Sequence, residues 1–180
     1  FRSECDFSKR ENVHTFLRSL PTKPSVIINA SCYTDVNGAE YNRDLALAIN
    51  ATAVKIIADF CYKENAALFH YSTDYVFNGS GISPINVSQK RDPINYYGET
   101  KKIAEECIAN SKCRAYILRT AWVYSVYGKN FLKTMMSLMQ DKEELQIVQD
   151  QHSSPTNAKN IAEVTVKMLQ GSHDYGVYHY

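Results

Sequence analysis

The sequence lacks the features of several protein classes. Its 20 Lys and Arg residues are offset by 19 Asp and Glu residues, which leaves a net charge of +1, and no basic cluster is present. An electrostatic nucleic-acid binder is therefore not expected. No apolar run approaches a membrane span in length, so we expect no transmembrane segment. The five cysteines are odd in number and lack CxxC spacing, which argues against a zinc site or disulfides and favours reduced thiols in the cytoplasm.

The remaining composition suits a soluble globular protein. The chain has 180 residues, of which 44% are hydrophobic and 22% are charged. That length is enough for one domain with a real core. Apolar periodicity predicts strands at residues 25–30, 67–72, 115–120, 145–148 and 176–180. It predicts helices at residues 9–20, 41–63, 129–141 and 157–170, and another that begins near Tyr97.

This order of elements predicts an α/β fold. The run at 25–30 is continuously apolar and β-branched, which is typical of a strand buried on both faces of a parallel sheet. Alternation of strands and helices implies right-handed crossovers and a doubly wound parallel sheet. We expect residues 1–180 to form an incomplete nucleotide-binding domain, with the start of a substrate-binding part near residues 150–180.

Tyr97 and Lys101 are four residues apart and would share one face of a helix. An ammonium near a phenol favours the phenolate and brings it closer to proton exchange at neutral pH. A carbonyl reductase needs this chemistry, because the oxygen takes a proton while the carbon takes hydride. The spacing alone is weak evidence, since an ordinary amphipathic helix also has it.

Hydroxyl-rich segments follow the predicted strands. They are 29–34 (Asn-Ala-Ser-Cys-Tyr-Thr), 72–75 (Ser-Thr-Asp-Tyr) and 120–122 (Thr-Ala-Trp). Each alone is more simply read as turn or capping chemistry. Ligands of a parallel sheet bind beyond the carboxyl ends of its strands. Three such segments beside the Tyr97 helix therefore favour a binding crevice there.

Several motifs occur in an order that resembles a known family. They are Asn29-Ala30 with Tyr33-Thr34, the run 72–79 (STDYVFNG), Tyr97-Gly98 with Thr100-Lys101, the run 119–124 (RTAWVY), the run 128–135 (GKNFLKTM), Asp150-Gln151 and 154–156 (SPT). Together they resemble the dTDP-4-dehydrorhamnose reductases, which are extended short-chain dehydrogenases/reductases with a Rossmann-like fold. The resemblance runs from about Asp6 to Tyr180.

The resemblance implies a catalytic set. Tyr97 would be the general acid that protonates the C4 keto oxygen of dTDP-4-dehydro-6-deoxy-L-mannose, so that dTDP-L-rhamnose forms. Lys101 would hold the nicotinamide ribose hydroxyls and lower the pKa of Tyr97. Thr73 would hydrogen-bond the same carbonyl oxygen. Asn50 resembles the family's structural Asn with a proton-relay role, and an ordinary helix Asn that bonds nearby backbone is nearly as plausible. His70 is expected to be a strand residue satisfied by a neighbour.

The resemblance also implies ligands. The cofactor would be NADPH or NADH, with Mg²⁺ at a subunit interface as an option, and the partner would be a dTDP-sugar, with a homodimer as an option. The residues implied for the cofactor are Asp6 and Phe7, at the adenine, and Asn29, Ala30, Tyr33, Tyr97 and Lys101. Those implied for the substrate are Asp74 and Tyr75, in the sugar pocket, and Trp122.

The sequence departs from the family in what it lacks. It has no GxGxxG, and that loop supplies the N–H groups that hold a pyrophosphate. We therefore expect a partial chain whose N-terminal strands precede Phe1. Residues 35–40 read Asp-Val-Asn-Gly-Ala-Glu, where the family has Ala-Val-Asp-Lys-Ala-Glu, and Ser153 stands where Gly is usual.

Two other functions fit the fold. One is a non-catalytic regulatory subunit, like the β subunit of methionine adenosyltransferase. The other is a sugar-nucleotide dehydratase or epimerase. Intact Thr73, Tyr97 and Lys101 favour the reductase over the regulator. The dehydratase is disfavoured because Asp74 is followed by Tyr75 and not by a second acid.

Overall fold

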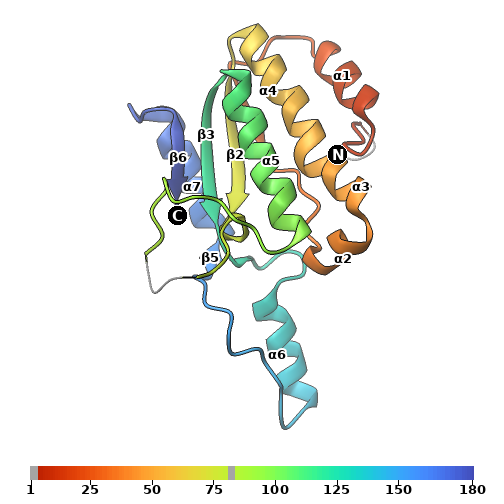
Figure 1. Ribbon diagram of the computed structural model, residues 1–180, viewed down its shortest axis with the longest axis vertical. Coiled ribbons are helices and arrows are strands. Elements are labelled where there is room, and N and C mark those ends of the chain that lie inside the picture. Colours follow the sequence, from red (N-terminus) through yellow and green to blue (C-terminus); the bar gives the residue numbers. More distant parts are fainter. Residues whose placement is uncertain (1–3, 81–83) are drawn as a thin grey trace. The chain divides into compact units, whose positions relative to one another are not determined.

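The computed structural model describes residues 4–80 and 84–180, and the chain falls into two compact units (Figure 1). One unit comprises the chain up to Arg119 together with Tyr175–His179, and the other runs from Thr120 to Asp174 and includes Tyr180. Residues 81–83 lie outside the described residues.

The first unit contains the main sheet. In the part of the chain that the structure describes, this sheet has the order β1-β2-β3-β6. Its strands are β1 (Val26–Asn29), β2 (Ala67–Thr73), β3 (Arg114–Thr120) and β6 (Gly176–His179). β1 pairs parallel with β2, and β6 pairs parallel with β3. The predicted α/β fold with a parallel sheet is confirmed.

Helices and helical turns connect the strands of this unit. They are α1 (Arg10–Arg18), α2 (Val36–Tyr41), α3 (Arg43–Leu47), the π-helical turn η1 (Ala48–Thr52), α4 (Ala53–Glu64), the 3-10 turn η2 (Asp74–Val76) and α5 (Tyr96–Ser111). α4 and α5 lie side by side on one face of the sheet, and α1 packs on α4 (Figure 1). The core between these layers is aliphatic and includes Val54, Ile57, Leu68, Ala104 and Ile117.

The helix Arg43–Glu64, formed by α3, η1 and α4, is long and apolar enough to cross a membrane by length and composition. No run of this kind is predicted from the sequence. Half of its most apolar 18-residue stretch is buried within the protein, and Val54, Ile57 and Ala58 belong to the core cluster. The packing is that of a core helix, which passes the same length test.

Two expectations for strands differ from the structure. The strand predicted at 25–30 is confirmed as β1, but Ile28 is 49% exposed there, so within the described residues β1 is not buried on both faces. Residues 145–148 form no strand. Ile147 and Val148 are exposed there, and β-branched residues form a strand only where another strand pairs with them.

The second unit is smaller. It contains β4 (Val123–Tyr124) and β5 (Thr156–Asn157), which pair parallel, and the helices α6 (Phe131–Asp141) and α7 (Ala158–Gln170). Both helices are capped by an asparagine. Asn130 Oδ1 accepts the Lys133 N–H at 3.1 Å, and Asn157 Oδ1 accepts the Lys159 N–H at 2.8 Å.

Candidate active site

A row of polar side chains crosses the carboxyl end of the main sheet. Side chains alternate between the two faces of a strand, so His70 and Ser72 of β2 point toward α5, as does Arg119 of β3. Asn29 is the register partner of His70, and His179 is that of Arg119. All of these except the partly exposed His179 are buried.

α5 presents three functional groups to this row. Tyr97, Lys101 and Glu105 are spaced by four residues, so they lie along one side of the helix. Lys101 and Glu105 are each 2% exposed. The helix begins where expected, because the Asn95 side chain accepts the Gly98 N–H at 2.7 Å as an N-cap. The first turns therefore hold Tyr97 at the end of the sheet.

Tyr97 lies between Thr73 and Cys32. The Thr73 side chain lies close enough to the phenol to lower its pKa, and the Cys32 thiol lies 3.8 Å from the phenol oxygen. The Tyr75 ring meets the Tyr97 ring edge-on, with centroids 5.9 Å apart. The structure thus brings the predicted general acid and the predicted threonine together.

The protonation of Tyr97 differs from the expectation. Burial raises the pKa of Tyr97 well above its ordinary value of 10.0, and Cys32 and Asp74 raise it further, while the Thr73 hydrogen bond lowers it. Lys101 is not among these influences, and the lowering expected from it stays a prediction. At neutral pH the phenol therefore keeps its proton, which is the form that a general acid needs.

Lys101 is held below the sheet end by two polar contacts. Its Nζ lies 2.7 Å from the Tyr71 carbonyl oxygen and 3.1 Å from His70 Nε2. Burial lowers the pKa of Lys101 from its ordinary value of 10.5, and Cys32 and Glu105 oppose that change. The amine is placed one helical turn from Tyr97, as its spacing in the sequence predicts.

Asn50 links two segments of the site. Its Oδ1 accepts the Tyr33 N–H at 2.7 Å, and its Nδ2 donates to the Tyr33 carbonyl at 3.1 Å and to Thr100 Oγ1 at 3.0 Å. Thr100 in turn donates to the Tyr97 carbonyl at 2.7 Å. Asn50 lies in the π-helical turn η1, a feature frequent at functional sites. These contacts fix the loop after β1 against α5, which is the structural role that was one of its two expected roles.

Glu105 is the centre of a buried ion-pair network. Its carboxylate accepts from Ser72 Oγ at 2.6 Å, from Arg119 Nε at 2.9 Å and Nη2 at 2.6 Å, and from Arg91 Nη1 at 3.1 Å. Arg119 also donates to the Val87 carbonyl at 3.1 Å. The network therefore ties the loop before α5 to β2 and β3.

The other predicted cofactor residues have local roles here. Asp6 Oδ1 accepts from the Ser8 N–H at 3.0 Å and the Ser8 hydroxyl at 2.6 Å. Phe7 packs against the core, and Ala30 is exposed after β1. Contacts of these residues with a cofactor stay a prediction.

The predicted substrate residues belong to different units. Asp74 and Tyr75 lie in η2 beside Thr73, and Asp74 Oδ1 accepts from Thr73 Oγ1 at 3.2 Å. Trp122 lies in the second unit, where it packs on Phe131 with ring centroids 5.2 Å apart. A contact between Trp122 and substrate stays a prediction.

Gly98 lets η2 approach α5. A Cβ at this position would overlap the Tyr75 carbonyl oxygen and would lie 3.0 Å from Pro93 Cβ. We expect Gly98→Ala to lower the free energy of unfolding by about 1–3 kcal/mol, because the backbone of η2 must move. Gly176→Ala is the matched control, since nothing lies within 4 Å of its added Cβ. Urea unfolding of both variants measures the difference, and equal stability would contradict this packing.

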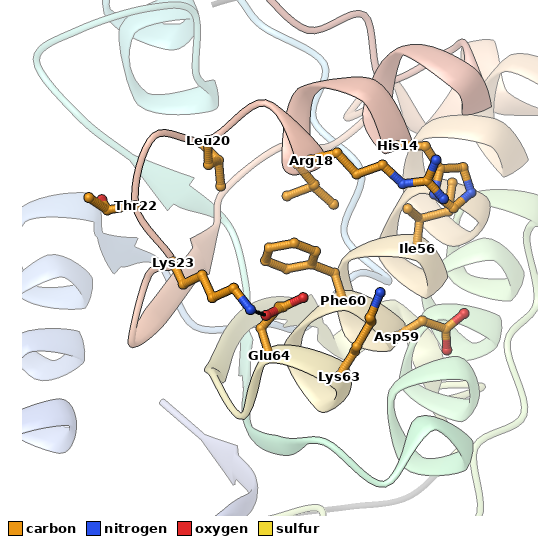
Figure 2. Close-up of a pocket in the computed structure, with 11 residues that line it drawn as sticks. His14, Arg18, Leu20, Thr22, Lys23, Ile56, Asp59, Phe60, Lys63 and Glu64 are labelled. Atoms are coloured by element: carbon orange, nitrogen blue, oxygen red, sulfur yellow. Dashed lines mark ion pairs between the residues drawn. The ribbon is translucent and has the colours of Figure 1, made fainter.

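A separate cavity of about 310 Å³ lies between α1 and the last turns of α4 (Figure 2). Leu17, Leu20 and Phe60 line it, and Lys23 pairs with Glu64 at its rim. α4 ends just before β2 begins. The cavity is therefore near the amino end of β2, opposite the end that carries Thr73, and it is not the candidate active site.

No group of three or more His, Cys, Asp or Glu side chains that could hold a metal is found within residues 4–80 and 84–180. The optional Mg²⁺ therefore gains no support from these side chains.

Sequence reasoning missed three participants in the site. Cys32, His70 and Glu105 contact the expected residues but were not assigned a role. For His70 a signal was available, because it lies two residues before Ser72 and so shares a face with it. Cys32 and Glu105 gave no comparable signal, since their contacts depend on the fold.

Comparisons with known proteins identify the family of this chain. The family model described as the RmlD substrate binding domain matches residues 1–180. A dTDP-4-dehydrorhamnose reductase of Escherichia coli K12 is 40% identical over 165 residues, which are 92% of this chain and 54% of that protein. One of Burkholderia thailandensis is 36% identical and covers 99% of this chain and 62% of that protein. The chain thus spans little more than half the length of these relatives.

Solved structures show the same relationship. The Bacillus anthracis dTDP-4-dehydrorhamnose reductase in complex with NADP superposes with a TM-score of 0.91 at 34% identity, over 99% of this chain and 63% of that one. The Clostridium acetobutylicum enzyme superposes with a TM-score of 0.92 at 35% identity, over 99% of this chain and 62% of that one. The resemblance found in the sequence is confirmed: this chain belongs to the RmlD substrate binding domain family, together with the dTDP-4-dehydrorhamnose reductases.

Proposed function

We propose that the protein reduces the C4 keto group of dTDP-4-dehydro-6-deoxy-L-mannose and so forms dTDP-L-rhamnose in the cytoplasm. The observation that carries the proposal is the position of the Tyr97 phenol beside Thr73 at the carboxyl end of β2, with Lys101 one turn further along α5. Relatives named for this reaction are 36–40% identical to the chain.

The residues at this end of the sheet fit a nicotinamide nucleotide. The loop after β1 is fixed by Asn50, and Lys101 brings an amine to the carboxyl end of β2, where such ligands bind in parallel sheets. The hydroxyls of Thr73 and Tyr97 and the amine of Lys101 are groups that can hydrogen-bond the ribose of a nucleotide. We propose NADPH as the cofactor, because a relative's structure contains NADP.

In this proposal the chain's own residues handle the proton. The Tyr97 phenol, which burial keeps protonated, gives its proton to the C4 oxygen. The Thr73 hydroxyl hydrogen-bonds the same oxygen and positions it against the phenol. Reduced nicotinamide supplies the hydride when it is bound. Asp74 and Tyr75 line the sugar side of the site, next to Thr73.

The test is a turnover assay of the full-length protein with NADPH and the dTDP-keto sugar. We expect loss of NADPH absorbance to match formation of dTDP-L-rhamnose, identified by mass and NMR. If the protein binds NADPH but consumes none with this sugar, the reductase proposal is wrong and the regulatory function replaces it.

A further inference from the structure

A chain of hydrogen bonds runs from Asn29 through His70 to Lys101, and all three residues are buried. Asn29 Nδ2 lies 3.2 Å from His70 Nδ1, and His70 Nε2 lies 3.1 Å from Lys101 Nζ. The direction of these bonds fixes the position of the protons. The proposed function assigns no role to Asn29 or His70 in this chain of bonds.

The orientation of the Asn29 amide is set by its other partners. Asn29 Oδ1 lies 3.1 Å from the Ser31 backbone nitrogen and 2.6 Å from Ser31 Oγ. A backbone N–H can only donate, so the atom that faces it must be the amide oxygen. The Asn29 NH₂ group therefore points to His70 and donates to its Nδ1.

His70 must then accept at Nδ1, which places its one ring proton on Nε2. Burial lowers the pKa of His70 well below its ordinary value of 6.5, so the ring is neutral. The Nε2–H group points at Lys101 Nζ. An ammonium has no lone pair to accept this bond, whereas a neutral amine has one.

We infer that Asn29, acting through His70, holds Lys101 as a neutral amine when no nucleotide is bound. In this state the amine accepts from His70 Nε2–H and donates to the Tyr71 carbonyl at 2.7 Å. Every contact in the chain is then satisfied. An ammonium at Lys101 would need the proton on His70 Nδ1, where it would face the Asn29 NH₂ group.

The other groups near Lys101 are compatible with a neutral amine. Cys32 and Glu105 are the groups that would favour a positive charge on Lys101. Glu105 is already paired with Arg119 and Arg91, so its charge is compensated. A neutral amine also leaves the Tyr97 phenol protonated, because no cation stabilises a phenolate there.

Asn29 and His70 are thus positioning residues for Lys101. Uptake of a proton by Lys101 requires that the ring proton of His70 moves from Nε2 to Nδ1 and that the Asn29 amide turns. The consequence for catalysis rests on the proposed function, but the protonation states do not.

The test is the tautomer of His70 in the nucleotide-free, full-length protein. Histidine labelled with ¹⁵N gives long-range ¹H–¹⁵N correlations that distinguish a protonated ring nitrogen from a bare one, and loss of a signal in His70→Gln assigns it. At about pH 7 we expect a neutral ring with its proton on Nε2. A proton on Nδ1, or on both nitrogens, would overturn the inference.

Asn29→Asp should reverse the donors and acceptors in the series of hydrogen bonds from Asn29 through His70 to Lys101. The introduced carboxylate can still accept from Ser31 but can only accept from His70, so the ring proton should move to Nδ1 and Lys101 should become an ammonium. Asn110→Asp, on the exposed side of α5, is the matched control and should leave the His70 ring proton on Nε2. An unchanged tautomer in Asn29→Asp would show that Asn29 does not set this state. A failed turnover assay would contradict the proposed function alone, because the ¹H–¹⁵N signals of His70 do not depend on catalysis.

Discussion

Tyr97→Phe is expected to lower kcat by about a hundred- to ten-thousand-fold, the usual contribution of general acid catalysis. The variant loses only the phenol oxygen beside Thr73, and it keeps the ring that packs edge-on against Tyr75. The KM for the sugar nucleotide and the Kd for NADPH should therefore change little. Steady-state kinetics and fluorescence titration with NADPH measure these quantities.

Tyr96→Phe is the control for this prediction. Tyr96 is adjacent in α5, and its ring lies under the Arg43 guanidinium at 4.7 Å. Loss of its hydroxyl should leave kcat unchanged. If Tyr97→Phe keeps more than about a tenth of the wild-type kcat, a phenol proton is not needed and Tyr97 is not the general acid.

Glu105→Ala should lower the free energy of unfolding by about 3–5 kcal/mol, because it leaves the 5% exposed Arg119 guanidinium without its buried partner. Glu106→Ala is the matched control. Glu106 is 43% exposed and lies 3.5 Å from Arg91, so its loss should cost no more than about 1 kcal/mol. Urea unfolding at neutral pH compares the two, and similar losses would contradict the network.

The same network predicts a dependence on pH. Burial alone would raise the pKa of Glu105, but hydrogen bonds from Arg119 and Ser72 and the charges of Arg119 and Arg91 outweigh it and lower the pKa below its ordinary value of 4.5. The contribution of Glu105 to stability is therefore complete above about pH 4.5 and is lost as the pH falls through the lowered pKa. Wild-type protein should lose more stability than Glu105→Gln over that acid range, and parallel pH profiles would contradict this.

The sequence predicts the elements whose signal is local. The helix that begins near Tyr97, the four-residue spacing of Tyr97 and Lys101, and the helix at 157–170 all depend on neighbours in the chain, and the structure confirms them as α5 and α7. The run at 145–148 failed because a strand needs a pairing partner, and no local pattern supplies one.

Contacts between distant segments could not be predicted in this way. Glu105 takes its arginines from fourteen residues before and fourteen after it, and Cys32 meets Tyr97 across 65 residues. A glutamate in a helix is usually solvated, so nothing near Glu105 indicates that the fold will bury it. The same holds for His70, whose two partners come from β1 and α5.

A crystal structure of the full-length protein with NADP⁺ and dTDP-L-rhamnose tests the central claim most directly. We predict that the sugar's C4 oxygen lies within about 3.2 Å of both the Tyr97 phenol oxygen and Thr73 Oγ1, the reach of a catalytic hydrogen bond. A C4 oxygen that is in contact with neither residue, in a complex with ordered sugar, would contradict the account.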